Sequence, residues 1–123
     1  MSEKANKAVE NHKRFYSCSA AVLCAFAEEA GISEQEAKAV AAPFAGGRMG
    51  KCGAVLAAEY VLSKRFPDKA DEKCAALEKE FTALNRSVLC RELKGALTGS
   101  PLRSCRGCVT DAAEILERMC SEY

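Results

Sequence analysis

Cysteine is the residue type that offers chemistry in this sequence. Eight of the 123 residues are cysteines, beside a single histidine and no tryptophan. Local signals predict that Cys18, Cys52 and Cys105 stand at the starts of helices, and Cys90 stands at a fourth, irregular junction. The amides and the dipole of a helix N-terminus favour an anion, which makes a thiol there easier to ionise. Because thiolate is the form that attacks electrophiles and binds metals, we expect functional thiols at such junctions.

A second pattern is the CxxC sequence that begins at Cys105 and ends at Cys108. This spacing serves both dithiol oxidoreductases and metal knuckles. A thioredoxin-like use would need a βαβ context and a zinc ribbon would need a second CxxC, and the sequence offers neither. Two interpretations stay open: a working Cys105/Cys108 pair, or a functional Cys105 followed by Cys108 as the first apolar residue of the last helix. The other cysteines, Cys24, Cys74 and Cys120, fall inside predicted helices and are interpreted as packing residues.

Glycines gather on both sides of Cys52. Their backbones can adopt angles, and approach a ligand closely, in ways that other residues do not allow. These candidate cofactor-binding residues are Gly46, Gly47, Gly50 and Gly53. The segment is not a nucleotide-binding P-loop, because its lysine is followed by Cys52 rather than by Ser or Thr and no predicted strand precedes it. No nucleotide cofactor is therefore expected.

Three cations adjoin the predicted site cysteines in sequence: Arg48, Lys51 and Arg91. They could hold thiolates ionised or bind an anionic substrate, or they could be ordinary solvated charges. His12 is the single imidazole, so no Ser-His-Asp or Cys-His catalytic set is convincing. Whether the protein is an enzyme stays open at this stage.

The elements that must position these cysteines are helices. The apolar pattern predicts a single all-α domain over residues 1–123, a compact bundle of five or six helices. The predicted ranges are 3–16, with Phe15 on its apolar side, 17–31, a helix from Ser33 to the break at Pro43, 52–66, 71–84 and 104–120. Ser33 and Glu36 form a capping box, and Gly31 is suited to stop the helix before it. Cys74, Leu77, Phe81 and Leu84 recur at helical spacing and predict a core stripe.

Charge and hydropathy exclude some classes of partner. Lys and Arg number 18 against 17 Asp and Glu, which removes the electrostatic footprint of a nucleic-acid binder. The longest apolar run, residues 20–27, is far shorter than the ~20 residues that a membrane span needs. The first residues lack the apolar stretch of a secretory signal, so we expect a cytoplasmic protein. Structural disulfides are rare in the cytosol, so metal binding or redox chemistry is the favoured use of the cysteines.

Four stretches of the sequence resemble those of a known family. They are residues 17–22, 46–54, 90–93 and 105–116. Together they resemble the C_GCAxxG_C_C family of redox-active proteins, over nearly the whole chain after residue 15. One position departs from the motif, since Ala57 stands where the pattern Cys-Gly-Ala-x-x-Gly has its last glycine.

The resemblance implies a small α-helical protein with four characteristic cysteines, here Cys18, Cys52, Cys90 and Cys105. The family includes the N-terminal part of split-Soret cytochromes, in which an iron-sulfur centre is associated with this domain. The haem-binding part of those cytochromes has no counterpart in this sequence, so no haem is expected. Three of the four positions coincide with helix starts predicted from local signals alone.

Four clustered thiolates would repel one another in a low-dielectric pocket unless a cation or a disulfide relieved the charge. A tetrathiolate site suits an iron-sulfur cluster, Zn or Cu(I). An iron-sulfur cluster tolerates ligands scattered along the chain, whereas structural zinc sites usually draw on closely spaced pairs. Glycine amides near the cluster sulfurs would tune the reduction potential.

We therefore expect an iron-sulfur protein for electron transfer or redox sensing, with Cys18, Cys52, Cys90 and Cys105 as ligands and Cys108 as a further candidate. Two alternatives remain: a thiol-disulfide oxidoreductase that uses Cys105 and Cys108, and a module that holds Zn or Cu(I). A redox partner protein is implied, and the sequence does not identify it. The alanine-rich helix over residues 52–62 could pack within the monomer or against a second copy, which leaves a homo-oligomer open.

Overall fold

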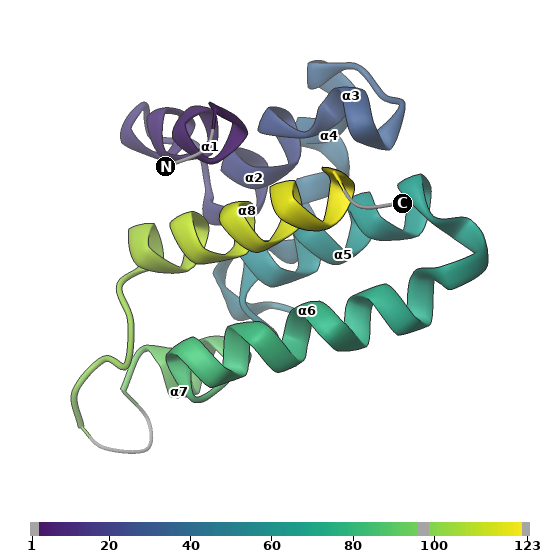
Figure 1. The fold of residues 1–123 in the computed structure, drawn as a ribbon. Coiled ribbons are helices and arrows are strands. Elements are labelled where there is room, and N and C mark those ends of the chain that lie inside the picture. The colour runs from purple at the N-terminus through teal and green to yellow at the C-terminus, as the bar shows by residue number, and fades with distance from the viewer. Residues whose placement is uncertain (1–2, 96–98, 122–123) are drawn as a thin grey trace.

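The computed structural model describes residues 3–95 and 99–121, and these residues form an all-α protein (Figure 1). The α-helices are α1 (Glu3–Lys13), α2 (Cys18–Ala25), α3 (Ala27–Ala30), α4 (Glu34–Ala41), α5 (Gly53–Arg65), α6 (Ala70–Asn85), α7 (Cys90–Leu93) and α8 (Cys105–Ser121). Two 3-10 segments, η1 (Ala42–Gly47) and η2 (Pro67–Lys69), connect them. Six of the helices described have eight residues or more, so the predicted all-α bundle is confirmed.

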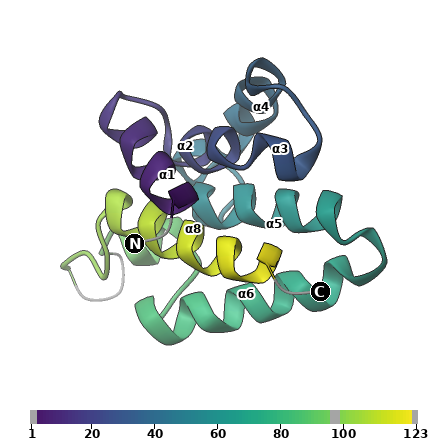
Figure 2. The same cartoon turned by 45° about the horizontal axis from the view of Figure 1, so that its top comes forward.

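The C-terminal helix α8 contacts four other helices. It packs against α1 and α2 on one side and against α5 and α6 on the other. In both views α5, α6 and α8 run side by side (Figures 1 and 2), and Figure 1 shows the short α7 at the same end of the molecule as the beginning of α8. The segment that leads into α8 and the helix starts near it therefore gather at one end of the molecule.

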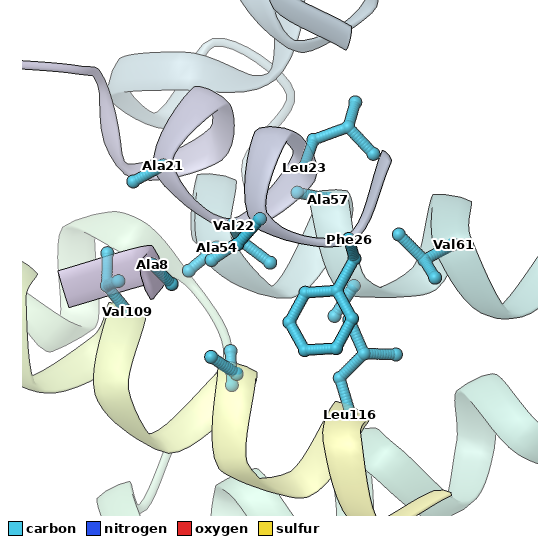
Figure 3. Close-up of a cluster of buried hydrophobic side chains, with 14 of the residues drawn as sticks. Ala8, Ala21, Val22, Leu23, Phe26, Ala54, Ala57, Val61, Val109 and Leu116 are labelled. Carbon is cyan, nitrogen blue, oxygen red and sulfur yellow. The ribbon is translucent and has the colours of Figure 1, made fainter. Parts of the chain in front are cut away.

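The core is built from small side chains around a few large ones. Phe26, Leu23 and Leu116 are fully buried, and Figure 3 shows the Phe26 ring lying between α2, α5 and α8. Alanines such as Ala54 and Ala57 are also fully buried and line the helix faces that meet there. Small residues let helix axes approach closely, which is the packing that an alanine-rich chain predicts. The core therefore fixes the helices near one another without a sheet.

Two helix boundaries follow the sequence closely. Ser33 accepts a hydrogen bond from the Glu36 amide, and the Glu36 side chain accepts one from the Ser33 amide, so the predicted capping box is present. Gly31 adopts the left-handed conformation, with φ of 72°, and ends the preceding helix as predicted. The helix predicted over 17–31 is divided at Phe26, where φ of −112° and ψ of 20° interrupt the regular turn.

Two apolar residues lie elsewhere than predicted. Phe15 follows the end of α1, has a positive φ of 71°, and is 98% exposed rather than part of an apolar face. Leu84 is 63% exposed, so the buried stripe of α6 is made by Leu77 and Phe81 and does not continue to the helix end. Helical spacing alone did not show where along each helix the packing against neighbouring helices ends.

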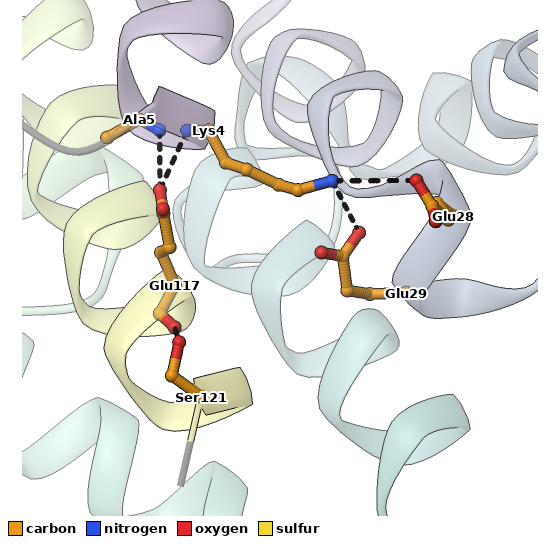
Figure 4. A network of polar contacts seen from close by, with 6 residues as sticks. All are labelled: Lys4, Ala5, Glu28, Glu29, Glu117 and Ser121. Atoms are coloured by element: carbon orange, nitrogen blue, oxygen red, sulfur yellow. Dashed lines mark hydrogen bonds and ion pairs between the residues drawn. The ribbon is translucent and has the colours of Figure 1, made fainter.

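The start of α1 is held by a polar network that spans the chain (Figure 4). The Glu117 carboxylate of α8 accepts hydrogen bonds from the backbone amides of Lys4 and Ala5, at 2.8 and 3.0 Å. These amides have no partner inside their own helix, so a carboxylate there satisfies donors and complements the helix dipole. The Lys4 ammonium also pairs with Glu29 at 3.0 Å. This network fastens α1 to α3 and α8.

No helix among the described residues is long and apolar enough to cross a membrane.

Candidate functional site

Five cysteines line one small cavity. They come from the starts of α2, α5, α7 and α8, and they are Cys18, Cys52, Cys90, Cys105 and Cys108. Gly46, Gly53, Leu93, Lys94 and Arg103 complete the lining. The cavity measures about 30 Å³, which is room for one or two water-sized molecules. The fold thus gathers the four predicted ligand positions and the additional candidate Cys108 around one space.

Cys18 and Cys52 meet because the starts of α2 and α5 approach closely. Cys18 is the first residue of α2, and the Ser17 hydroxyl caps that helix by accepting from the Ala20 amide. Cys52 is the N-cap residue of α5. A β-carbon at Gly53 would lie 2.7 Å from the Cys18 sulfur and 2.9 Å from the Phe44 carbonyl oxygen. The bare backbone at Gly53 is therefore what permits this approach.

Cys52 and Cys90 are brought together by two backbone hydrogen bonds. Lys51 and Leu89 form an isolated antiparallel bridge. The Cys52 amide donates to the Val88 carbonyl at 2.7 Å, and the Cys90 amide donates to the Gly50 carbonyl at 3.0 Å. This pairing aligns the two cysteines although they lie 38 positions apart along the chain. No alternating pattern in the sequence signals such a short pairing.

The segment before α8 positions Cys105 and Cys108 at the cavity. The Leu102 amide donates to the Leu93 carbonyl at 2.8 Å, which holds this segment against the end of α7. Cys105 opens α8 and is exposed, whereas Cys108, one turn later, is 3% exposed. The two cysteines of the CxxC sequence therefore line the same cavity at different depths.

The pKa values of Cys52 and Cys108 are shifted in opposite directions. A hydrogen bond from the Cys108 thiol, more than any other influence, lowers the pKa of Cys52 to about 7. Burial opposes this change, while the amides of Val55 and Ala54 at the start of α5 and the Lys94 ammonium favour the thiolate. The same hydrogen bond, followed by burial and the Cys52 charge, raises the pKa of Cys108 far above its usual range. Cys52 is therefore the readily ionised member of the pair, and Cys108 keeps its proton.

The neutral form is also favoured at two half-buried lining thiols, Cys18 and Cys90. Burial, followed by the neighbouring Cys52 charge, raises the pKa of Cys18, although the Gly46 amide partly opposes this change. Burial also raises the pKa of Cys90, and the Lys94 ammonium opposes it. The cavity thus contains one favoured thiolate among several thiols, as expected when like charges share a desolvated space.

The four candidate glycines have different roles. Gly46 and Gly53 line the cavity, and the Gly46 amide interacts with the Cys18 sulfur. A β-carbon at Gly47 would lie 3.0 Å from the Cys90 β-carbon, so Gly47 makes room for Cys90. Gly50 lies outside the lining, and its carbonyl accepts a hydrogen bond from the Cys90 amide. Cofactor binding by these residues stays a prediction.

The cations at the cavity are not those that adjoin the cysteines in sequence. Lys94 and Arg103 line it, and Arg103 is held by an ion pair with Asp111 at 3.1 Å. Of the three predicted candidates, Arg48 donates to the Ala42 carbonyl and none lies in the lining. Two spacings could have pointed to the correct cations: Lys94 follows Cys90 by four residues, one helical turn, and Arg103 precedes Cys105 by two.

Lys51 belongs instead to a second polar cluster, between α5 and α6. Its ammonium pairs with Glu78 at 2.5 Å and with Glu59 at 3.6 Å. Burial, followed by a hydrogen bond with Glu78, raises the pKa of Glu59 to about 8. The hydrogen bond with Glu59, ahead of the Lys51 interaction, lowers the pKa of Glu78. The two carboxyl groups of Glu59 and Glu78 therefore hold one proton between them, and it stays on Glu59.

The remaining cysteines lie outside the cavity lining. The Cys24 thiol donates to the Glu34 carbonyl at 3.8 Å, and the Cys74 thiol donates to the Glu59 carbonyl at 3.6 Å. Cys120 is buried near the end of α8, and burial raises its pKa to about 11. His12 also lies outside the lining, and its Nδ1 accepts from Arg106 at 3.3 Å. These environments agree with packing roles for the three cysteines.

Over residues 3–95 and 99–121, no three His, Cys, Asp or Glu side chains are arranged to hold a single metal ion. The cavity nevertheless offers five sulfur donors and no carboxylate or imidazole among its lining residues. This donor set is of the soft type that suits iron-sulfur clusters and soft metal ions.

Comparison with known proteins gives one match. The family model described as "Putative redox-active protein (C_GCAxxG_C_C)" matches residues 16–119. The chain belongs to this family. A search of the curated proteins and a search of the solved structures each found no match. The C_GCAxxG_C_C family is described as redox-active, and the matched range includes all five cysteines that line the cavity.

Proposed function

We propose that this C_GCAxxG_C_C protein binds an iron-sulfur cluster and uses it for electron transfer or redox sensing. The observation that carries the proposal is the convergence of Cys18, Cys52, Cys90 and Cys105 on one cavity from four separate helix starts. Clusters accept thiolates that are scattered along a chain, and sequence spacing as wide as this is common for them.

The chain's own residues fit the needs of such a site. Bound to these four cysteines, the cluster would supply one-electron redox chemistry. Cys52, with its lowered pKa, would present the first thiolate, and the remaining thiols would release protons as they became ligands. Lys94 and Arg103 would offset the negative charge of the thiolates, and the Gly46 amide would lie against the Cys18 sulfur. Because the cavity measures only about 30 Å³ and the thiols are not arranged around a single ion, loading would require the lining side chains to move apart and rotate.

The experiment is an anaerobic purification of the full chain, followed by a visible spectrum and analysis of iron, acid-labile sulfide, zinc and copper on the same sample. We expect visible absorption that scales with iron and sulfide. Zinc or copper without iron would support the metal-binding alternative instead. A protein that stays colourless after anaerobic reconstitution with iron and sulfide would refute the cluster proposal.

Cysteine variants assign the ligands. Replacing Cys18, Cys52, Cys90 or Cys105 with Ser, one at a time, should reduce cluster content several-fold. Cys24→Ala is the matched control, because Cys24 is buried but lies outside the cavity lining. Its iron content should equal that of the wild type, and a loss comparable to that of the four Ser variants would contradict the assignment.

A further inference from the structure

Exposed apolar side chains are concentrated near the cavity cysteines. Among the residues that the structure describes, the large hydrophobic side chains that are exposed are Phe15, Met49, Leu84 and Leu89. Phe15 and Met49 each lie three positions before a cavity cysteine, and Leu89 directly precedes Cys90. Met49 also lies near Cys90 in space, because Gly50, the next residue, accepts a hydrogen bond from the Cys90 amide at 3.0 Å. The cavity therefore opens beside apolar surface that the fold leaves uncovered.

Basic residues gather in the two segments that contain Met49 and Leu89. Residues 42–53 and 86–107 contain seven Lys and Arg and a single Glu, whereas the whole chain contains 18 Lys and Arg against 17 Asp and Glu. The near-neutral total thus hides a positive end, and the rest of the chain carries an excess of acidic residues. The exposed cations of the two segments are mostly arginines: Arg48, Arg86, Arg91, Lys94, Arg103 and Arg106.

Most of these cations are available to a partner. Within the described part of the chain, only Arg103 of the six belongs to an ion pair, with Asp111 at 3.1 Å. Cys105 lies between Arg103 and Arg106 in sequence and is the cavity cysteine whose residue is exposed. We call the surface formed by Met49, Leu89, Cys105 and the six cations the cysteine face.

We propose that the cysteine face docks an acidic protein, which is the redox partner of this chain. Protein interfaces are enriched in Arg and Met, and the centre of such an interface is apolar. Guanidinium groups pair bidentately with carboxylates, and a positive patch speeds the encounter with a negative one. That the docked protein exchanges electrons rests on the proposed function. The docking itself rests on the exposed charges and apolar side chains of the face.

Nucleic acid is the other polyanion that a positive surface attracts. Its non-specific binding comes from phosphate contacts, which need no apolar centre. Met49 and Leu89 are exposed among the cations, and this mixture favours a protein surface as the occupant.

The first test measures binding of the full chain to a plant-type ferredoxin, an acidic electron-transfer protein, by isothermal titration calorimetry. We expect binding at about 20 mM NaCl and a Kd at least tenfold higher at about 300 mM, because salt screens the charges of the two surfaces. A basic c-type cytochrome and a single-stranded DNA oligonucleotide are the comparison ligands. No binding of the ferredoxin at low salt, or equal or tighter binding of either comparison ligand, would overturn the proposal.

The second test compares two double variants of equal net charge. Arg91→Glu/Arg106→Glu reverses two charges of the cysteine face, in the first turns of α7 and α8, where a glutamate is compatible with the helix dipole. Lys64→Glu/Lys69→Glu reverses two exposed charges near the connection between α5 and α6, which lies at the opposite end of the molecule from the beginning of α8 (Figures 1 and 2). Circular dichroism checks that both variants fold.

The two variants should differ clearly in ferredoxin binding at about 100 mM salt, where charges more than about 10 Å away are largely screened. We expect the variant of the cysteine face to raise Kd at least tenfold and the distant variant to raise it less than twofold, as rough bounds. An equal loss in both would mean that net charge, and not this face, attracts the ferredoxin.

Binding is measured for metal-free and for reconstituted protein, so the outcomes separate this proposal from the cluster proposal. A chain that docks the ferredoxin but takes up no cluster would overturn the cluster proposal alone. A chain that takes up a cluster but does not dock the ferredoxin would overturn the docking proposal alone.

Discussion

At the scale of single residues, Gly53 decides whether the site can assemble. Its missing β-carbon would lie 2.7 Å from the Cys18 sulfur and 2.9 Å from the Phe44 carbonyl oxygen, which is a backbone atom and cannot rotate away. Gly53→Ala should therefore destabilise the protein by ~1–3 kcal/mol through overpacking, and should displace Cys18. Urea unfolding measures the first effect, and the alkylation rate of Cys18 measures the second.

Gly107→Ala is the matched control for this substitution. Gly107 also lies in the first turn of a long helix, but its added β-carbon would meet only the outer part of the Arg103 side chain, which can swing away. The cost of a loosened Arg103–Asp111 pair, ~0–1 kcal/mol, would be offset by the higher helix propensity of alanine. Equal destabilisation by both substitutions would show that the contact with Cys18 is not what requires glycine.

Glu59 makes the stability depend on pH. Its pKa is raised from 4.5 to about 8, so the folded state binds a proton more tightly than the unfolded chain does. This contribution is fully present below pH 4.5 and is lost as the pH rises through about 8. We expect the free energy of unfolding to fall less steeply between pH 5 and pH 9 in Glu59→Gln than in the wild type. Urea unfolding at several pH values measures this difference.

Glu78→Gln provides the opposite case. The pKa of Glu78 is lowered, so its contribution is present above its ordinary value of 4.5 and is lost as the pH falls below it. This variant also removes the acceptor of the Lys51 ammonium, so it should lower stability at neutral pH. If Glu59→Gln and Glu78→Gln had the same pH profile, the assignment of the shared proton to Glu59 would be wrong.

At the scale of elements, the end of α6 contains an identifiable strain. Arg86 caps this helix with a φ of 74°, a left-handed conformation that costs a non-glycine residue about 1 kcal/mol. Arg86→Gly should therefore raise the free energy of unfolding by ~0.5–1 kcal/mol, as measured by urea denaturation. Lys79→Gly, at an exposed position inside the same helix, should lower it by ~1 kcal/mol. A loss of stability in Arg86→Gly would mean that the arginine side chain contributes more than its backbone costs.

The helices themselves were largely predictable, because their signals are local. Serine caps, Gly31 and helical spacing gave the starts of α2, α4, α5 and α8 from neighbouring residues alone. The interruption at Phe26 and the exposure of Leu84 were missed, because both depend on which helices pack nearby. A periodic pattern states which face is apolar, and only the tertiary fold states how far that face is covered.

The sequence predicted which cysteines line the cavity better than it predicted which other residues lie beside them. The sequence and the family resemblance named the cysteines that line the cavity, including Cys108. The cations that line the cavity were not predicted, because their position depends on tertiary contacts. Arg48, Lys51 and Arg91 are near the site cysteines in sequence, whereas the Leu102–Leu93 hydrogen bond brings the segment with Arg103 to the end of α7.

At the scale of the whole molecule, the cavity is the place where distant parts of the chain are joined. Its lining begins at Cys18 and ends at Cys108, so it connects α2, α5, α7 and α8. The segment from Arg86 to Ser104 contains one short helix among its described residues. The Lys51–Leu89 bridge, the buried Leu93 side chain and the Arg103–Asp111 ion pair connect it to the rest of the protein. A group bound by Cys90 and Cys105 would tie both ends of this segment to the helical core.

Removal of the bound group should therefore loosen the protein unevenly. Because the group binds the folded state, its loss should lower stability by a few kcal/mol, roughly 10 °C in Tm. Hydrogen exchange should increase most in the described residues between 86 and 104, whose ordering depends on the cavity, and least in α1, which Glu117 holds from outside it. The measurement compares reconstituted protein with the same sample after chelation, with a phosphine reductant present so that the cavity cysteines stay reduced. Equal Tm values, or loosening centred on α1, would mean that the cavity does not bind the group with ligands from both ends of the segment.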